Sequence, residues 1–131
     1  MDKQEDRMSE IPTTILVVDD DEFTAELTGM VLEAADYTVV IAVGGMEALE
    51  VMAQDPTVRM VVSDMNMPFI NGIQLFSELR EQGYNQPFIL LTGDDAAPLR
   101  VAHPDMDAVL TKDEDLQEAL PNLVESLLLR D

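Results

Sequence analysis

The stretch ILVVDDD, residues 15–21, sets the pattern on which the fold prediction rests. Its apolar, β-rich half ends abruptly in three aspartates, which is typical of a strand buried on both faces. Asp21 is the expected N-cap of a helix that follows at once. The apolar positions of that helix recur with a helical period and predict its inward face. They are Phe23, Leu27, Met30, Val31 and Ala34.

Strand and helix patterns continue to alternate beyond this point. Further strands are predicted at 37–42, 60–62, 88–91 and 108–110. Helices are predicted at 46–53, with Met46, Leu49 and Met52 inward, and around 73–79, with Gly83 at the C′ position. A last helix carries leucines at 116, 120, 123 and 127 and is expected to be interrupted by Pro121. Apolar strands joined through helices over short loops predict an α/β fold, a doubly wound parallel sheet with helices on both faces.

Composition narrows the class of protein. The 131 residues suffice for one domain, and 47% apolar with 26% charged residues is typical of a folded globular chain. No apolar run approaches the ~18–20 residues of a membrane span, and no signal sequence opens the chain. The net charge of -20 disfavours direct binding to nucleic acid or to anionic membranes. With no cysteine, the composition fits a cytoplasmic protein.

Polar side chains gather where the predicted strands end. Asp19 and Asp20 follow the first strand, Asp64 the third, Thr92 the fourth and Lys112 the fifth. The carboxyl ends of parallel strands share one edge of the sheet, where such folds place their sites. Carboxylates held together repel one another, and a hard cation such as Mg²⁺ relieves that repulsion. A carboxylate nucleophile, a metal, a hydroxyl and a lysine together indicate phosphoryl chemistry.

These residues stand in motifs that resemble the receiver domains of two-component response regulators. The motifs are ILVVDDD at 15–21, SDMNMP at 63–68 with Asn71-Gly72 beyond it, LTG at 91–93 and LTK at 110–112. The resemblance runs from about Ile15 to the C-terminus. It implies the flavodoxin-like receiver fold of five parallel strands and five helices. Residues 1–12 are mixed polar and end in Pro12, which predicts a flexible N-terminal arm before a receiver domain at 13–131.

The resemblance assigns a role to each site residue. Asp64 would be the phospho-acceptor, taking a phosphoryl group from a histidine kinase or phosphotransfer protein. Asp20 and Asp64 would bind Mg²⁺ directly, with the backbone carbonyl of Asn66, while Asp19 would hold the ion mainly through water. Lys112 would contact Asp64 and the phosphoryl group. Thr92 would turn its hydroxyl toward a phosphoryl oxygen, the switching movement of the family.

The sequence departs from the family pattern after the fourth strand. Asp113 follows Lys112, where most members have a proline, and Val109 occupies the position of the family's aromatic switch residue. Pro98 and Pro104 lie in the segment 93–107, so the fourth helix is expected to be short, displaced or absent. We therefore expect phosphorylation to reorganise this segment rather than to reorient a side chain at Val109.

Two other functions remain open at this level. One is a pseudo-receiver, an unphosphorylated interaction module, which the altered Lys112-Asp113 junction allows. The other is a phosphatase of the haloacid-dehalogenase type, which would use Asp19 and Asp21; Phe23 does not fit that pattern. The favoured interpretation is a receiver that is not an enzyme with turnover. It would act through an effector domain or protein, as a stand-alone chain or as a fragment of a longer regulator.

Overall fold

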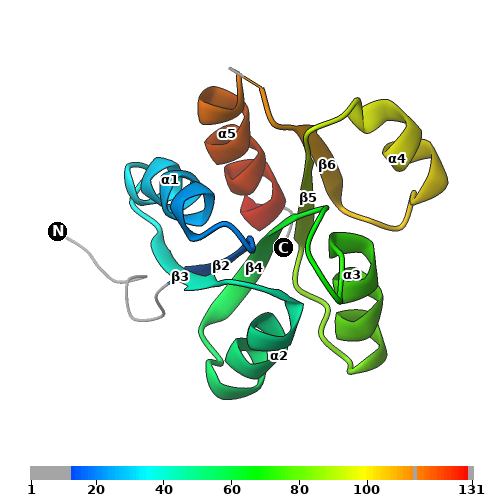
Figure 1. Ribbon diagram of the computed structural model, residues 1–131. Coiled ribbons are helices and arrows are strands. Elements are labelled where there is room, and N and C mark those ends of the chain that lie inside the picture. The colour runs from blue at the N-terminus through cyan, green and yellow to red at the C-terminus, as the bar shows by residue number, and fades with distance from the viewer. Residues whose placement is uncertain (1–12, 114, 130–131) are drawn as a thin grey trace, which may run out of the picture.

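Strands and helices alternate along the computed structural model, which describes residues 13–113 and 115–129 (Figure 1). The strands are β2 (Thr14–Val18), β3 (Thr38–Ala42), β4 (Val58–Asp64), β5 (Phe88–Thr92) and β6 (Ala108–Thr111). The helices are α1 (Glu22–Glu33), α2 (Gly45–Gln54), α3 (Gly72–Glu81), α4 (Ala96–Ala102) and α5 (Leu116–Leu129). The arm predicted at 1–12 lies outside the described residues. Within the described ranges, no helix has both the length and the apolarity of a membrane span.

The strands form one parallel sheet in the order β3-β2-β4-β5-β6. The chain runs outward from β2 to β3 and then crosses to the other side of β2 to form β4. This reversal lies between β2 and β4, and in open α/β sheets such a point leaves a crevice at the carboxyl ends of the strands. The predicted doubly wound fold is therefore confirmed.

Helices cover both faces of the sheet, and each strand supplies both layers of the core. Ile15 and Val17 pack with α1 and α5 on one face, whereas Leu16 and Val18 pack with α2 and α3 on the other. Figure 1 shows the same division, with α1 and α5 together and α2 and α3 opposite. Burial on both faces explains the unbroken apolar run of β2.

The inward face predicted for α1 is wrong. Phe23, Leu27 and Met30 are exposed, and the buried residues of this helix are Ala25, Thr28, Gly29 and Leu32. The reason is the close approach of α1 to β3: a Cβ added at Gly29 would lie 3.2 Å from Cγ1 of Val39. Small side chains permit that approach, so the larger apolar ones remain on the outer surface.

Two further details of the helices differ from the prediction. Met46 is exposed, and α2 buries Ala48 and Met52 while Leu49 is half-buried. Pro121 does not interrupt α5, which runs unbroken from Leu116 to Leu129. An interior proline costs about 3 kcal/mol, but burial of a large apolar side chain returns ~1.5–3 kcal/mol. The buried residues Leu120, Val124 and Leu127 therefore keep the helix continuous.

The prediction of a short fourth helix is confirmed. Helix α4 has seven residues, and Pro98 lies in its first turn, where no backbone N–H is needed for the helix. His103 follows as the C-cap, and Pro104 comes directly after it. At the end of α3, Gly83 has a φ of 93°, which confirms the predicted C′ position.

The loop between β4 and α3 is tightly constrained. Phe69 has a φ of 69° and lies at the centre of a turn in which the Ile70 amide donates to the Pro68 carbonyl at 2.7 Å. Such a turn is rare and strained. At the far end of the loop, the Gly72 amide donates to the Met65 carbonyl at 2.9 Å. The loop thus closes directly over the end of β4.

We predict that Gly72→Ala lowers the free energy of unfolding by about 1–3 kcal/mol, the usual effect of overpacking. A Cβ at this position would overlap Cδ1 of Leu90 and lie 2.6 Å from the carbonyl oxygen of Asp64. Urea denaturation followed by circular dichroism provides the measurement. Gly93→Ala is the matched control, because a Cβ there meets nothing within 4 Å. Equal stability of the two variants would contradict this account of the loop.

Candidate phosphoryl and metal site

The register of the sheet brings the ends of four strands to one level. Val18 pairs with Ser63, so Asp19 and Asp64 are the next residues along β2 and β4. Thr92 pairs with Thr111 at the ends of β5 and β6. The backbone amide of Lys112 donates to the Thr92 carbonyl at 2.7 Å, which carries the alignment one residue further. Residues far apart in sequence therefore meet at the carboxyl edge of the sheet.

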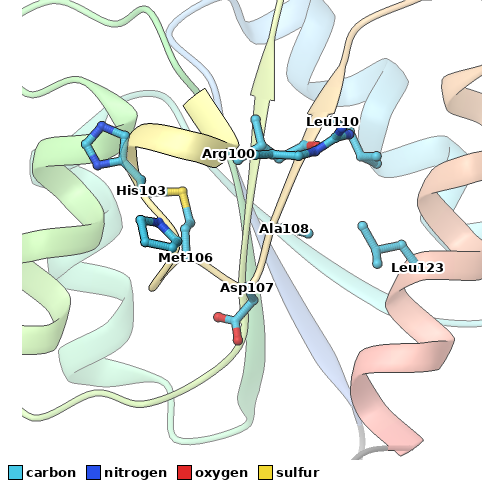
Figure 2. Close-up of a pocket in the computed structure, with 9 residues that line it drawn as sticks. Arg100, His103, Met106, Asp107, Ala108, Leu110 and Leu123 are labelled. Atoms are coloured by element: carbon cyan, nitrogen blue, oxygen red, sulfur yellow. The ribbon is translucent and has the colours of Figure 1, made fainter. Parts of the chain in front are cut away.

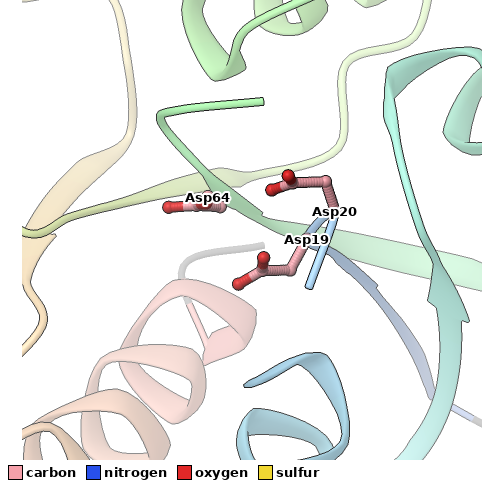
Figure 3. A group of neighbouring side chains, drawn as sticks. All are labelled: Asp19, Asp20 and Asp64. Atoms are coloured by element: carbon pink, nitrogen blue, oxygen red, sulfur yellow. The ribbon is translucent and has the colours of Figure 1, made fainter. Parts of the chain in front are cut away.

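Three carboxylates lie together at this edge (Figure 3). Asp19, Asp20 and Asp64 each offer one oxygen atom, and these atoms lie within 4.8 Å of one another. Asp19 and Asp64 are buried, whereas Asp20 is exposed. The cluster therefore has one wall open to solvent, through which an ion or a reactant can enter.

Lys112 is the cation of the cluster. Its Nζ lies 2.9 Å from Oδ1 of Asp64 and 3.4 Å from Oδ2 of Asp19. Lys112 comes from the end of β6, so its side chain spans β5 to reach the two acids. The predicted convergence of Asp19, Asp20, Asp64 and Lys112 is thus present in the structure.

Burial and charge oppose each other in this cluster. Burial has the largest effect on Asp19 and raises its pKa, as does the charge of Asp64, and these effects outweigh the Asp21 amide and Lys112, which lower it. A raised carboxyl pKa means that the ionised Asp19 destabilises the fold at neutral pH. Burial alone would lower the pKa of Lys112, but the hydrogen bond and charge of Asp64, with a smaller effect of Asp19, raise it.

Asp21 has a different role from its two neighbours. Its Oδ1 accepts the backbone amides of Phe23 at 3.1 Å and Thr24 at 3.4 Å, which confirms the predicted N-cap of α1. A dehalogenase-type site would need Asp21 beside Asp19 as a working carboxylate. Here the third member of the cluster is Asp64, so the geometry favours the receiver interpretation.

Thr92 is the last residue of β5, and Asn66 follows the end of β4 by two residues. Thr92 is buried, and its hydroxyl accepts the Asp94 amide at 3.1 Å. Asn66 has an exposed side chain in the loop that follows β4. Its carbonyl as a metal ligand stays a prediction, as does the switching movement of Thr92.

The departures from the family pattern have clear local structures. The Lys112-Asp113 peptide bond is trans, and Oδ1 of Asp113 accepts the Asp115 amide at 3.0 Å. Glu114, between Asp113 and Asp115 in the sequence, lies outside the described residues. Val109 is buried.

Two polar residues near the site carry no role in the sequence prediction. The Thr111 hydroxyl accepts the Ala96 amide at 3.2 Å, and the Arg100 guanidinium donates to the Val109 carbonyl through Nε at 3.1 Å and Nη2 at 2.8 Å. The scarcity of basic residues in this acidic chain is the one sequence signal that could have drawn attention to Arg100. Thr111 belongs to the LTK motif, and strand threonines are too common to signal a contact.

Comparisons with known proteins agree with this geometry. The family model of the response regulator receiver domain matches residues 15–124. The transcriptional regulatory protein GlrR of Escherichia coli K12 is 38% identical over 95 residues, which cover 72% of this chain and 21% of that protein. The response regulator MprA of Mycobacterium ulcerans is 38% identical over 111 residues, covering 83% of this chain and 47% of that protein. The chain spans half or less of these relatives.

Solved structures show the same fold. The receiver domain of the Francisella response regulator 1452 superimposes with a TM-score of 0.80 at 29% identity, covering 89% of this chain and 97% of that one. The response regulator TrrA of Thermotoga maritima, solved in complex with Mg²⁺-BeF, has a TM-score of 0.78 at 28% identity. It covers 88% of this chain and 98% of that one.

We predict that Lys112→Met lowers the free energy of unfolding at pH 7 by about 1–3 kcal/mol, because it leaves two buried carboxylates without their cation. The Lys112 side chain is partly exposed, which keeps the effect below that of a fully buried ion pair. Because the pKa of Lys112 is raised, its stabilising charge is fully present below its ordinary pKa of 10.5 and is lost as pH rises through the folded value. Wild type should therefore lose more stability than Lys112→Met above that pH.

A double-mutant cycle with Asp64→Asn separates the ion pair from packing. Removing the carboxylate should reduce the effect of Lys112→Met, because the two changes act on one interaction. Urea denaturation of wild type, both single variants and the double variant gives the coupling free energy. Strictly additive effects would show that the 2.9 Å contact between Lys112 and Asp64 contributes nothing to stability.

Proposed function

Since the chain belongs to the receiver domains of two-component response regulators, we propose that Asp64 accepts a phosphoryl group from a phosphohistidine donor in a Mg²⁺-dependent step. The observation that carries the proposal is the site at the carboxyl edge of the sheet. Three carboxylates lie within 4.8 Å of one another there, and Lys112 lies 2.9 Å from Asp64. Transfer of a phosphoryl group to a carboxylate needs a nucleophile and a positive charge at the same place.

The residues of the chain have distinct parts in this reaction. A carboxylate oxygen of Asp64 attacks phosphorus, an O–P bond forms, and the P–N bond of the donor breaks with its electron pair going to the imidazole. The Lys112 ammonium already contacts Asp64, so it is placed to pair with a phosphoryl oxygen. Thr92 is the further hydroxyl that would turn toward that group from the end of β5. Buried surroundings strengthen each of these interactions.

The donor set fits a magnesium ion. Hard oxygen ligands with water completing an octahedron are what Mg²⁺ prefers, and the exposed Asp20 leaves room for that water. Asp20, Asp64 and the Asn66 carbonyl would hold the ion, with Asp19 acting mainly through water, and the ion would neutralise charge on the phosphoryl oxygens. Its binding would also relieve the repulsion that raises the pKa of Asp19. The TrrA structure was solved in complex with Mg²⁺-BeF.

A protein donor has a surface on which to dock. Phe23 and Met30 expose apolar side chains along α1. Beside them a groove of about 640 Å³ lies between α1 and α5, and Lys112 lines it together with Leu27 and Leu116. Because Lys112 both lines this groove and contacts Asp64, the groove lies next to the reaction site. A helix of a histidine kinase or phosphotransfer domain, docked there, would bring its phosphohistidine to Asp64.

The output of the reaction is a changed protein surface rather than a released product. In this proposal the chain carries its own phosphoryl group and loses it again, and an effector domain or protein reads the difference. The curated relatives extend well beyond the length of this chain. The alternative is a pseudo-receiver, which would bind partners without being phosphorylated. The next experiment distinguishes the two functions.

We expect acetyl phosphate with Mg²⁺ to add one phosphoryl group to the wild-type chain, visible by intact-mass spectrometry. Asp64→Ala should remain unlabelled because it lacks the nucleophile, and beryllofluoride should bind only when Asp64 is present. Asp105→Ala, at an exposed aspartate away from the cluster, is the control and should label like wild type. Equal labelling of Asp64→Ala and wild type would overturn the assignment.

We further expect Mg²⁺ to raise the free energy of unfolding, by about 2.7 kcal/mol at 100 times its Kd. The gain should be smaller in Asp20→Asn, which loses one ligand. Without metal that variant should equal or exceed the wild type in stability, because it removes one charge from the cluster. Thermal unfolding with and without Mg²⁺ provides the measurement, with Asp105→Asn as control. A Mg²⁺ response in Asp20→Asn that matches the wild type would exclude Asp20 as a ligand.

A further inference from the structure

The loop between β5 and α4 is held between two threonine hydroxyls. Thr92 Oγ1 accepts the Asp94 amide at 3.1 Å. Thr111 Oγ1 accepts the Ala96 amide at 3.2 Å and donates to the Asp94 carbonyl at 3.3 Å. The two threonines are register partners on β5 and β6. Asp94 is thus attached on its N–H side to one strand and on its carbonyl side to the other.

Arg100 attaches the other end of α4 to β6. Its guanidinium donates to the Val109 carbonyl through Nε at 3.1 Å and Nη2 at 2.8 Å. Strand β6 is an edge of the sheet with β5 on one side only, and Arg100 supplies a partner for this carbonyl from α4. Figure 2 shows Arg100 reaching from α4 toward β6. Arg100 also lines a hollow of about 400 Å³, to which α5 contributes Leu123.

Apolar packing contributes little to the attachment of α4. Ala96 is its single fully buried residue, Leu99 is half-buried, and Val101 is 82% exposed. Seven residues are also fewer than the ~12–15 that an isolated helix needs to be even marginally stable. The position of α4 therefore depends on the polar contacts at its two ends.

We propose that Thr111 and Arg100 form a two-point latch that holds α4 against β6, and that phosphorylation of Asp64 opens it at the Thr111 end. The inference rests on the proposed function. When the Thr92 hydroxyl turns toward the phosphoryl group, the Asp94 amide loses its acceptor. Asp94 and Ala96 belong to the same short turn that Thr111 holds, so displacement of Asp94 breaks the Thr111 contacts as well.

The latch supplies a signal path that needs no aromatic ring. The Val109 side chain is buried in the same apolar cluster as Ala96 of α4 and has no ring to reorient, while its backbone carbonyl accepts from Arg100. Release of the Thr111 end leaves α4 attached by Arg100 alone, and the helix can then pivot about that point. The hollow bordered by Arg100, His103, Met106 and Leu123 widens as it does so, which changes the surface that an effector meets.

Amide hydrogen exchange of the full chain, with Mg²⁺ in the presence and absence of beryllofluoride, tests the latch. In wild type, the adduct should speed exchange between residues 94 and 102. In Thr111→Val, exchange there should already be at least about tenfold faster without the adduct, as expected for the loss of the two hydrogen bonds of the Thr111 hydroxyl, and the adduct should add little. Thr111→Ser keeps the hydroxyl and should behave like wild type.

Arg100→Gln tests the second point of attachment and should speed amide exchange around residues 99–103. This variant replaces Thr111→Val in the test if Thr111→Val does not fold. Thr38→Val and Arg59→Gln, at exposed positions on β3 and β4, are the matched controls and should leave the segment unchanged. The ¹⁹F signal of bound beryllofluoride reports the proposed function separately. An adduct on wild type without faster exchange at 94–102, or the wild-type pattern in Thr111→Val, would overturn the latch and leave the function intact. Absence of any adduct would overturn both.

Discussion

The repulsion between Asp19 and Asp64, held in check by Lys112, is the constraint on which the rest of this structure depends. The parallel register forces the two carboxylates together at the ends of neighbouring strands, and burial raises the pKa of Asp19. One ammonium, 2.9 Å from one acid and 3.4 Å from the other, offsets that repulsion in part. The remaining unfavourable charge makes the site ready to bind a cation, because a divalent ion removes a destabilisation that folding itself creates.

The sequence predicted the features that depend on the type of residue at a strand end and on the spacing of apolar residues. Apolar strands ending in acids, hydroxyl or lysine were sufficient for the sheet and for the convergence of Asp19, Asp20, Asp64 and Lys112, since parallel strands end at one edge. The orientation of α1 was beyond such reasoning. Its apolar stripe is real, but the close approach at Gly29 turns a face of small residues inward and leaves Phe23 and Met30 outside. Periodicity shows that a helix has an apolar face; it does not show whether the core or a partner covers that face.

The contacts around α4 were out of reach for a related reason. Arg100 bonds a backbone carbonyl and Thr111 bonds a backbone amide, and such partners leave no trace in the sequence. The prolines at 98 and 104 did predict a short helix, because their effect on the backbone is local. Its attachment to β6 depends instead on where the edge strand leaves a carbonyl unpaired, which only the assembled sheet determines.

The scarcity of basic residues explains how these contacts are distributed. The chain has seven lysines and arginines against 27 acids, so a cation near the core is surrounded by possible partners. Three cations among the described residues each connect two parts of the fold. Lys112 joins β6 to β2 and β4, Arg100 joins α4 to β6, and Arg80 joins α3 to Asp107 at 3.2 Å while lying over the Phe76 ring. Each cation is effective because of where its side chain lies, between two elements, rather than because it changes the net charge of the chain. In so acidic a chain, mutual repulsion lowers stability generally. Lys112 opposes it at the carboxyl edge of the sheet, where a phosphoryl group on Asp64 would add further negative charge.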